Sequence, residues 1–151
     1  MNWFRKSKQK VQSIPDLTTS ILYNEDTFYN QFVQDLLATK EEVIIESPYI
    51  TKKRLHMLKP TFEKLMRKGI KIFILTKNPQ EHEKSMAEQS ELGIQYFESL
   101  GLQVLLIKGG HHRKLAIIDR KILWEGSLNI LSQSNSREFM RRIESKKLAE
   151  E

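Results

Sequence analysis

Apolar segments of two different periodicities alternate along this chain of 151 residues, and this alternation restricts the fold more than any other feature. Short runs rich in Val, Ile, Leu and Phe predict strands, and apolar residues at helical spacing between them predict amphipathic helices. The predicted strands cover residues 20–23, 43–47, 70–76 and 104–107, and the predicted helices cover residues 25–39, 53–68 and 85–100. Pro60 is expected to bend the second helix or to separate its first turn.

The C-terminal third of the chain departs from this alternation. Two β-prone segments, residues 115–118 and 122–124, are separated by a short polar segment at Asp119-Arg120 and predict an antiparallel hairpin. Residues 138–143 predict one further strand. We therefore predict an α/β/α sandwich with a central mixed β-sheet, which is parallel at first and antiparallel around the hairpin.

The length of the chain fits one domain, which we place at residues 18–151 after a basic N-terminal tail, residues 1–17. Trp3 and Phe4 lie in this tail, which we expect to be loosely ordered rather than inserted into a membrane surface or stacked on bases. No run of about 18 apolar residues predicts a membrane span, and no signal peptide is recognisable. The absence of cysteine fits a cytoplasmic protein, and the formal net charge of +6 favours nucleic acid as a partner.

Candidate catalytic residues are concentrated just before and within the predicted hairpin. His112 and Lys114 are two residues apart on a predicted strand, so both side chains are expected on the same face. Such a pair places a nucleophile or proton carrier next to a fixed cation. Phosphoryl transfer needs both groups, because negative charge spreads over the non-bridging oxygens in the transition state.

The length of the hairpin turn decides which residues face this pair. If Asp119 and Arg120 form a two-residue turn, Ser127 lies opposite His112 and Glu125 lies opposite Lys114, whereas a longer turn would shift this register. We expect Gly126 to let the backbone approach a ligand. Asn129 would then supply an amide to the same phosphate.

Three carboxylates compete for the role of orienting His112. Asp119 is seven residues away, about 23 Å along a straight strand, so we expect it to organise the turn instead. Glu138, at the start of the last predicted strand, is the better candidate for fixing the tautomer of the imidazole. Glu46 is either a second carboxylate of the site or a strand-end residue paired with a nearby lysine. His111, of opposite parity to His112, is expected at the rim.

This arrangement resembles the phospholipase D superfamily, whose signature is H-x-K-x4-D-x6-G-S-x-N. Its positions are filled here by His112, Lys114, Asp119, Gly126, Ser127 and Asn129. Residues 43–50 are similar to the early strand of the superfamily with its Ser-Pro-Tyr end, and residues 134–138 to its later Asn/Ser-rich turn with an acidic residue. Residues 121–131 are similar to the nuclease-like domains of the superfamily found beside helicases.

The resemblance implies a metal-independent phosphodiesterase that uses no cofactor and passes through a phosphohistidine. Because the chain contains one signature where many members contain two, it also implies a homodimer with the site on the two-fold axis. The expected substrate is DNA or RNA, with Ser47, Tyr49, Lys52 and Lys53 as substrate-binding residues, and a helicase or another repair or defence protein as a further partner. The alternatives are a nucleic-acid-binding or assembly module that hydrolyses little and, with less support, a lipid phosphodiesterase. A metal centre is not expected, since no cysteine or helical histidine pair could form one.

Overall fold

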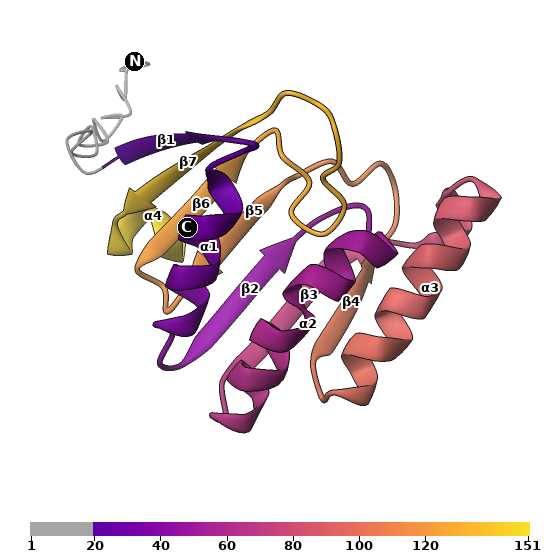
Figure 1. The fold of residues 1–151 in the computed structure, drawn as a ribbon, viewed down its shortest axis with the longest axis horizontal. Coiled ribbons are helices and arrows are strands. Elements are labelled where there is room, and N and C mark those ends of the chain that lie inside the picture. Colours follow the sequence, from indigo (N-terminus) through magenta and orange to yellow (C-terminus); the bar gives the residue numbers. More distant parts are fainter. Residues whose placement is uncertain (1–19) are drawn as a thin grey trace, which may run out of the picture.

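A computed structural model describes residues 20–151 of the chain, so the predicted tail with Trp3 and Phe4 lies outside the described residues. One sheet of seven strands forms its centre, in the order β1-β7-β6-β5-β2-β3-β4 (Figure 1). The strands are β1 (Ser20–Asn24), β2 (Glu42–Glu46), β3 (Lys71–Lys77), β4 (Gln103–Ile107), β5 (Leu115–Ile118), β6 (Ile122–Gly126) and β7 (Phe139–Glu144).

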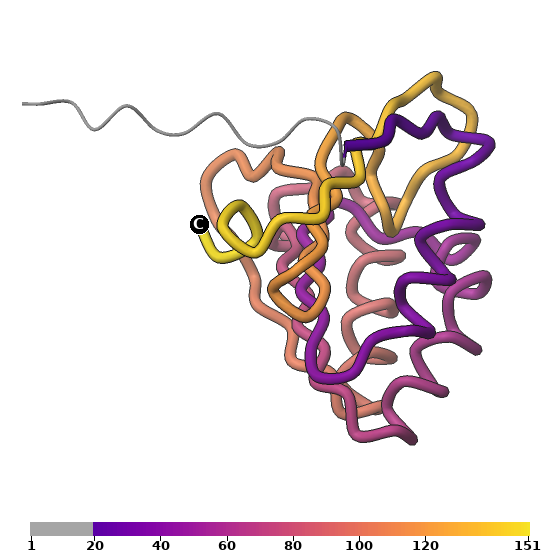
Figure 2. Tube along the Cα trace, turned by 90° about the vertical axis from the view of Figure 1, so that its left-hand side faces the viewer, coloured from indigo at the N-terminus to yellow at the C-terminus, as the bar shows by residue number. Residues whose placement is uncertain are grey.

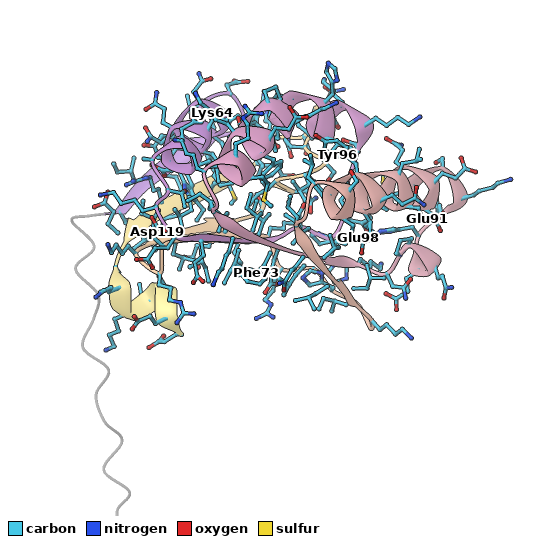
Figure 3. All side chains as sticks on the ribbon, turned by 90° about the horizontal axis from the view of Figure 1, so that it is seen from below. Lys64, Phe73, Glu91, Tyr96, Glu98 and Asp119 are labelled. Atoms are coloured by element: carbon cyan, nitrogen blue, oxygen red, sulfur yellow. The ribbon has the colours of Figure 1, made fainter. Side chains whose placement is uncertain are left out.

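The helices form two layers of unequal size. They are α1 (Phe28–Leu37), α2 (Lys52–Arg67), α3 (Lys84–Ser99) and α4 (Lys146–Glu150), together with the short 3-10 helix η2 (Pro79–Glu81). The three long helices cover one face of the sheet, and α4 lies on the other face (Figures 2 and 3). The predicted α/β/α architecture is confirmed, although its second helical layer is only one short helix.

The sheet is mixed as predicted. Strands β2, β3 and β4 are parallel to one another, whereas every pair from β2 through β5, β6 and β7 to β1 is antiparallel. Alternate residues of β3 are buried towards the helices, for example Ile72 and Ile74, as expected for a strand with one face against a core. Phe73, between them, lies on the opposite face (Figure 3).

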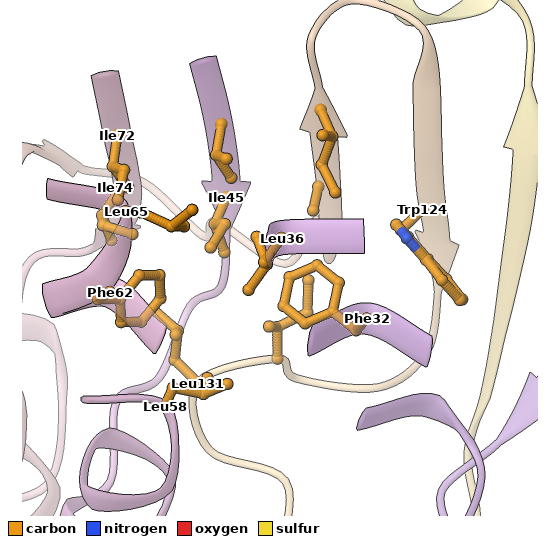
Figure 4. Close-up of a cluster of buried hydrophobic side chains, with 14 of the residues drawn as sticks. Phe32, Leu36, Ile45, Leu58, Phe62, Leu65, Ile72, Ile74, Trp124 and Leu131 are labelled. Atoms are coloured by element: carbon orange, nitrogen blue, oxygen red, sulfur yellow. The ribbon is translucent and has the colours of Figure 1, made fainter. Parts of the chain in front are cut away.

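The core lies between the sheet and the three long helices (Figure 4). Trp124 of β6 is fully buried and packs edge-on against Phe28 and Phe32 of α1. Its indole nitrogen donates to Asp35 at 2.9 Å, and Arg142 of β7 also binds this carboxylate, at 2.7 Å. This buried network joins α1 to two neighbouring strands.

Two helices differ from their predicted form. Helix α1 begins at Phe28 rather than at residue 25, because the Asn24 side chain accepts hydrogen bonds from the amides of Asp26 and Thr27 and holds a turn there. Helix α2 continues across Pro60 without being divided. No helix within residues 20–151 has the length and apolar composition to cross a membrane.

The hairpin turn is longer than the two residues assumed in the predicted register. Asp119 and Arg120 both adopt positive φ, 52° and 51°, and pairing resumes with Ile118 opposite Ile122. Three residues therefore separate the strands, and Leu115 lies opposite Glu125. The predicted pairs Ser127 with His112 and Glu125 with Lys114 are wrong by one residue.

Candidate active site

The residues of the signature lie at both ends of the β5–β6 hairpin. His112 and Lys114 precede β5, and Ser127 and Asn129 follow β6, so these four lie at the end of the sheet where β2 also ends (Figure 1). Asp119 lies at the other end, in the turn between β5 and β6. The spacing of the signature therefore divides its residues between two places in the fold.

His112 and Lys114 are held differently. The side chain of His112 is exposed and its ring makes no hydrogen bond to any residue between 20 and 151. Lys114 is half-buried, and its Nζ donates to the carbonyl oxygen of His112 at 2.7 Å. The ammonium thus lies beside the main chain of the histidine, which places a cation next to the imidazole-bearing residue.

Ser127 joins β6 to β7. Its Oγ accepts from the amide of Phe139 at 3.1 Å, and its own amide donates to the Phe139 carbonyl at 3.0 Å. A Cβ at Gly126 would lie 2.1 Å from this same carbonyl oxygen. The close approach that requires glycine is therefore made to β7, and the predicted approach to a ligand is not needed to explain it.

Asn129 begins the turn that follows β6. Its carbonyl accepts hydrogen bonds from the amides of Ser132 and Gln133, at 3.1 and 2.8 Å. The Oδ1 atom of its side chain is buried and has no partner among the described residues. A buried acceptor without a hydrogen bond lowers the stability of the folded chain. In a native structure such an atom is explained by a bound water, an ion or a functional role.

The carboxylate of Asp119 supports the fold at the far end of the hairpin (Figure 3). It accepts from the amides of residues 40, 41 and 42 at 2.9, 2.8 and 3.0 Å. Burial alone raises the pKa of Asp119, but these three hydrogen bonds and the nearby Lys121 together lower it below its ordinary value. The carboxylate of Asp119 was expected to organise the hairpin turn, but its three bonds go to the amides at the start of β2 and just before it.

Glu138 immediately precedes β7 and is half-buried. Its amide donates to Glu25 at 3.1 Å, and its carboxylate makes no hydrogen bond to His112 within the described chain. Its predicted role as the orienting carboxylate stays a prediction.

Glu46 and His111 form a buried pair that the sequence interpretation missed. The Nε2 atom of His111 lies 3.0 Å from Glu46 Oε2, and Arg113 Nε lies 3.1 Å from the same oxygen. His111 is buried, so its predicted place at the rim is wrong. The partner of Glu46 is a histidine and an arginine instead of a lysine. The sequence did contain one signal for this pair. His111 and Arg113 alternate with His112 and Lys114, so their side chains are expected on the opposite side of the segment.

The Ser-Pro-Tyr turn after β2 contributes both buried and accessible residues. Ser47 is fully buried, and its Oγ accepts from the amide of Leu131 at 3.1 Å. Tyr49 and Lys53 are among the residues that line a cavity of about 340 Å³ between this turn, the start of α3 and the loop after β6. Lys52 is exposed at the start of α2. Of the predicted substrate-binding residues, Tyr49, Lys52 and Lys53 are thus accessible and Ser47 is not.

The ring of Tyr49 packs against the ring of His82. Its centroid lies 4.9 Å from that of His82, with 33° between the planes. Burial first, and then the charge of Lys77, lower the pKa of His82, so the imidazole is favoured in its neutral form.

Residues 20–151 contain no group of three or more His, Cys, Asp or Glu side chains arranged to hold a metal ion.

Comparisons with known proteins agree with this fold. The family described as "Cardiolipin synthase, PLD-like domain" matches residues 32–151. Among solved structures, Nuc from Salmonella typhimurium, a phospholipase D family member, has a TM-score of 0.71 at 14% identity, with 87% of this chain and 86% of that chain covered. NucT from Helicobacter pylori has a TM-score of 0.66 at 22% identity, with coverages of 86% and 87%.

A larger protein contains the same fold as one part. The phosphatidylserine synthase of Haemophilus influenzae has a TM-score of 0.65 at 17% identity, but the match covers 87% of this chain and only 36% of that one. A search of curated proteins finds no match. Because the family match spans most of the chain and the solved relatives share its fold, the chain belongs to the phospholipase D superfamily, in the family of PLD-like domains.

Proposed function

We propose that the protein is a metal-independent phosphodiesterase that cleaves DNA or RNA through a phosphohistidine, in a site shared by two copies of the chain. The observation that carries this proposal is the exposed imidazole of His112, free of hydrogen bonds to the described chain and next to Lys114. The attacking nitrogen of a nucleophilic imidazole must be accessible to the substrate. The Lys114 ammonium supplies positive charge for the phosphoryl oxygens.

The proposed reaction has two steps. The imidazole of one His112 attacks phosphorus and forms a P–N bond, while the P–O bond to the leaving group breaks and the partner subunit's His112 gives its proton to the leaving oxygen. That second imidazole then takes a proton from water, whose oxygen attacks phosphorus and breaks the P–N bond. Both histidines return to their starting states. Lys114, Ser127 and Asn129 of both subunits bind the non-bridging oxygens.

Nucleic acid is the substrate that charge and size favour. The formal net charge of +6 attracts a polyanion. Tyr49 offers an aromatic ring and Lys53 a cation at one cavity, the combination that binds bases and phosphates of a single strand. Similarity to Nuc and NucT, over 87% and 86% of this chain, also supports this substrate.

The homodimer is supported by the surface beside the signature. Leu22 and Phe139 are each 59% exposed, so this surface carries apolar side chains that a partner can cover. Together with Gly126 and Ser127 they line a cavity of about 420 Å³. A second copy that buried these side chains would bring its own signature close to Ser127.

The test is a cleavage assay on labelled single- and double-stranded DNA and RNA in excess EDTA, with the His112→Ala protein as the control. We expect the wild-type protein to cleave at least one substrate with EDTA present and the variant to cleave none. Loss of cleavage in EDTA that magnesium restores would contradict the proposal. Phospholipid vesicles in the same assay would reveal a lipid phosphodiesterase.

The dimer has its own test, because one chain provides one His112 and the reaction needs a nucleophile and a separate acid. Sedimentation at assay concentrations should give the mass of two chains. An active monomer would contradict a shared site.

A second function is supported by the same geometry. Lys114 is bound to a carbonyl of its own chain, and no carboxylate within residues 20–151 holds His112, as expected of a pocket that binds phosphate without turning it over. The protein would then be a nucleic-acid-binding module. A salt-dependent shift of labelled DNA without cleavage would favour this alternative.

A further inference from the structure

Glu46, the last residue of β2, binds the residues on both sides of His112. Its Oε2 lies 3.0 Å from His111 Nε2 and 3.1 Å from Arg113 Nε. A carboxylate can only accept, so both nitrogens donate to one oxygen. The side chains of His111 and Glu46 are 4% and 9% exposed, which shields their contact from water. Breaking a buried contact of this kind is more costly than breaking one at the surface.

The segment that carries His112 has few other attachments to the sheet. Residues 108–114 form neither helix nor strand, and Gly109 and Gly110 adopt positive φ, 85° and 73°. The amide of Gly109 donates to Glu81 at 3.0 Å, and at the other end the carbonyl of Lys114 accepts from Gly126 at 3.3 Å. Between Gly109 and Lys114, the described segment is bonded to the sheet by the contacts of His111 and Arg113 with Glu46.

We propose that Glu46 is a positioning residue for the reaction, which fixes the main chain at His112 by holding His111 and Arg113. Alternate residues of an extended segment point to opposite sides. Because His111 and Arg113 are turned to Glu46, His112 and Lys114 are turned away from it. They point to the side on which the substrate phosphate binds in the proposed function. Since the His112 ring has no hydrogen bond to the part of the chain that the structure describes, its place depends on the main chain that carries it. The role in catalysis rests on the proposed function.

The first test does not need activity. Backbone order parameters from NMR relaxation at residues 108–114 should be lower in Glu46→Gln than in the wild type, with the rest of the protein unchanged. Glu42→Gln is the matched control, because Glu42 is on the same strand and binds Arg120 at 2.7 Å at the opposite end. Unchanged order parameters at residues 108–114 in Glu46→Gln, or lowered order parameters throughout the sheet, would overturn the proposal.

The second test measures turnover of bis(p-nitrophenyl) phosphate. We expect Glu46→Gln to lower kcat about 10- to 100-fold with KM changed less than about threefold, the effect of a displaced nucleophile on a substrate that still binds. Glu42→Gln should stay within about twofold of the wild type. A melting temperature lowered in Glu46→Gln with kcat unchanged would show a merely structural residue and would overturn the proposal.

Arg113→Gln provides a second variant that keeps the buried pair, because the Arg113 side chain is 75% exposed. It should lower kcat about 3- to 10-fold, and the double variant with Glu46→Gln should be no slower than Glu46→Gln alone, since both act through one oxygen. Full additivity would overturn the shared role. If the wild-type protein cleaves no phosphodiester, the proposed function fails, while the relaxation experiment still decides whether Glu46 holds the segment.

Discussion

The two ends of the β5–β6 hairpin carry residues of one signature, yet their bonding differs. At the turn, Asp119 accepts three hydrogen bonds from the main chain of residues 40–42. At the open end, the ring of His112 binds no described residue, and Asn129 keeps a buried oxygen without a partner. At the turn, the polar side chain is bonded within the chain itself. At the open end, polar groups are left for a ligand to bind.

This difference indicates that the signature combines two kinds of requirement. Residues at the turn determine how the hairpin attaches to β2, so their loss should reduce stability. At the open end, the exposed ring of His112 contributes little to the fold, so its loss should reduce activity alone. Substitutions at the two ends can therefore separate stability from catalysis.

The largest effect is expected at the open end. His112→Ala and Lys114→Ala should each lower kcat by a factor on the order of 10⁴ or more, because one removes the nucleophile and the other the charge on the phosphoryl oxygens. The melting temperature of His112→Ala should stay close to that of the wild type, since the ring has no partner to lose. A large drop in melting temperature would remove the contrast between the two ends.

Glu138 belongs to the open end by position. If its carboxylate orients His112 in the assembled site, Glu138→Gln should keep the fold and lower kcat by about 10²- to 10⁴-fold, the scale of a tautomer defect. Steady-state rates and thermal melts measure both quantities. A harmless Glu138→Gln would assign the orienting role elsewhere.

A moderate effect on stability is expected at the turn. Asp119→Asn replaces an acceptor of three main-chain hydrogen bonds by an amide that can satisfy them only in part, at a cost of about 1 to 3 kcal/mol. For a domain of this size the melting temperature should fall by roughly 2 to 4 °C per kcal/mol. The kcat of the folded variant should be near that of the wild type. Lost activity with an unchanged melting temperature would place Asp119 in catalysis.

The smallest effect is the pH dependence of that stability difference. The pKa of Asp119 is lowered in the folded chain, so the unfolded chain binds the extra proton and the contribution of the carboxylate increases with pH. The difference between wild type and Asp119→Asn should be complete above about pH 5 and shrink as the pH falls below the ordinary value of 3.8. Thermal melts over this range measure it, and a difference that grows on acidification would contradict the assignment.

Most of the fold could be predicted because strand and helix periodicities are local. The boundary of α1 could not, since Asn24 forms its own turn with Asp26 and Thr27. The hairpin register also could not, because the turn is set by Asp119 and its partners 77 to 79 residues away in the chain. Local turn preferences do not contain that information.

The candidate site was predicted to a similar extent. The spacing predicted His112 and Lys114 on one face of a strand, but both residues lie in the segment that precedes β5, where the Lys114 ammonium binds the His112 carbonyl. The pairing of His111 with Glu46 joins residues 65 positions apart, so the local alternation of side chains gives the side to which His111 points but not its partner. A signature describes the groups that react, and it says little about what holds them.

The most direct measurement is identification of the covalent intermediate. Rapid mixing with bis(p-nitrophenyl) phosphate, alkaline quenching and peptide mass spectrometry should show a burst of nitrophenolate and a phosphoryl group carrying one nitrophenyl ester on His112. EDTA should not change either result. An adduct on His111 or any other residue, or turnover retained by His112→Ala, would contradict a reaction through His112.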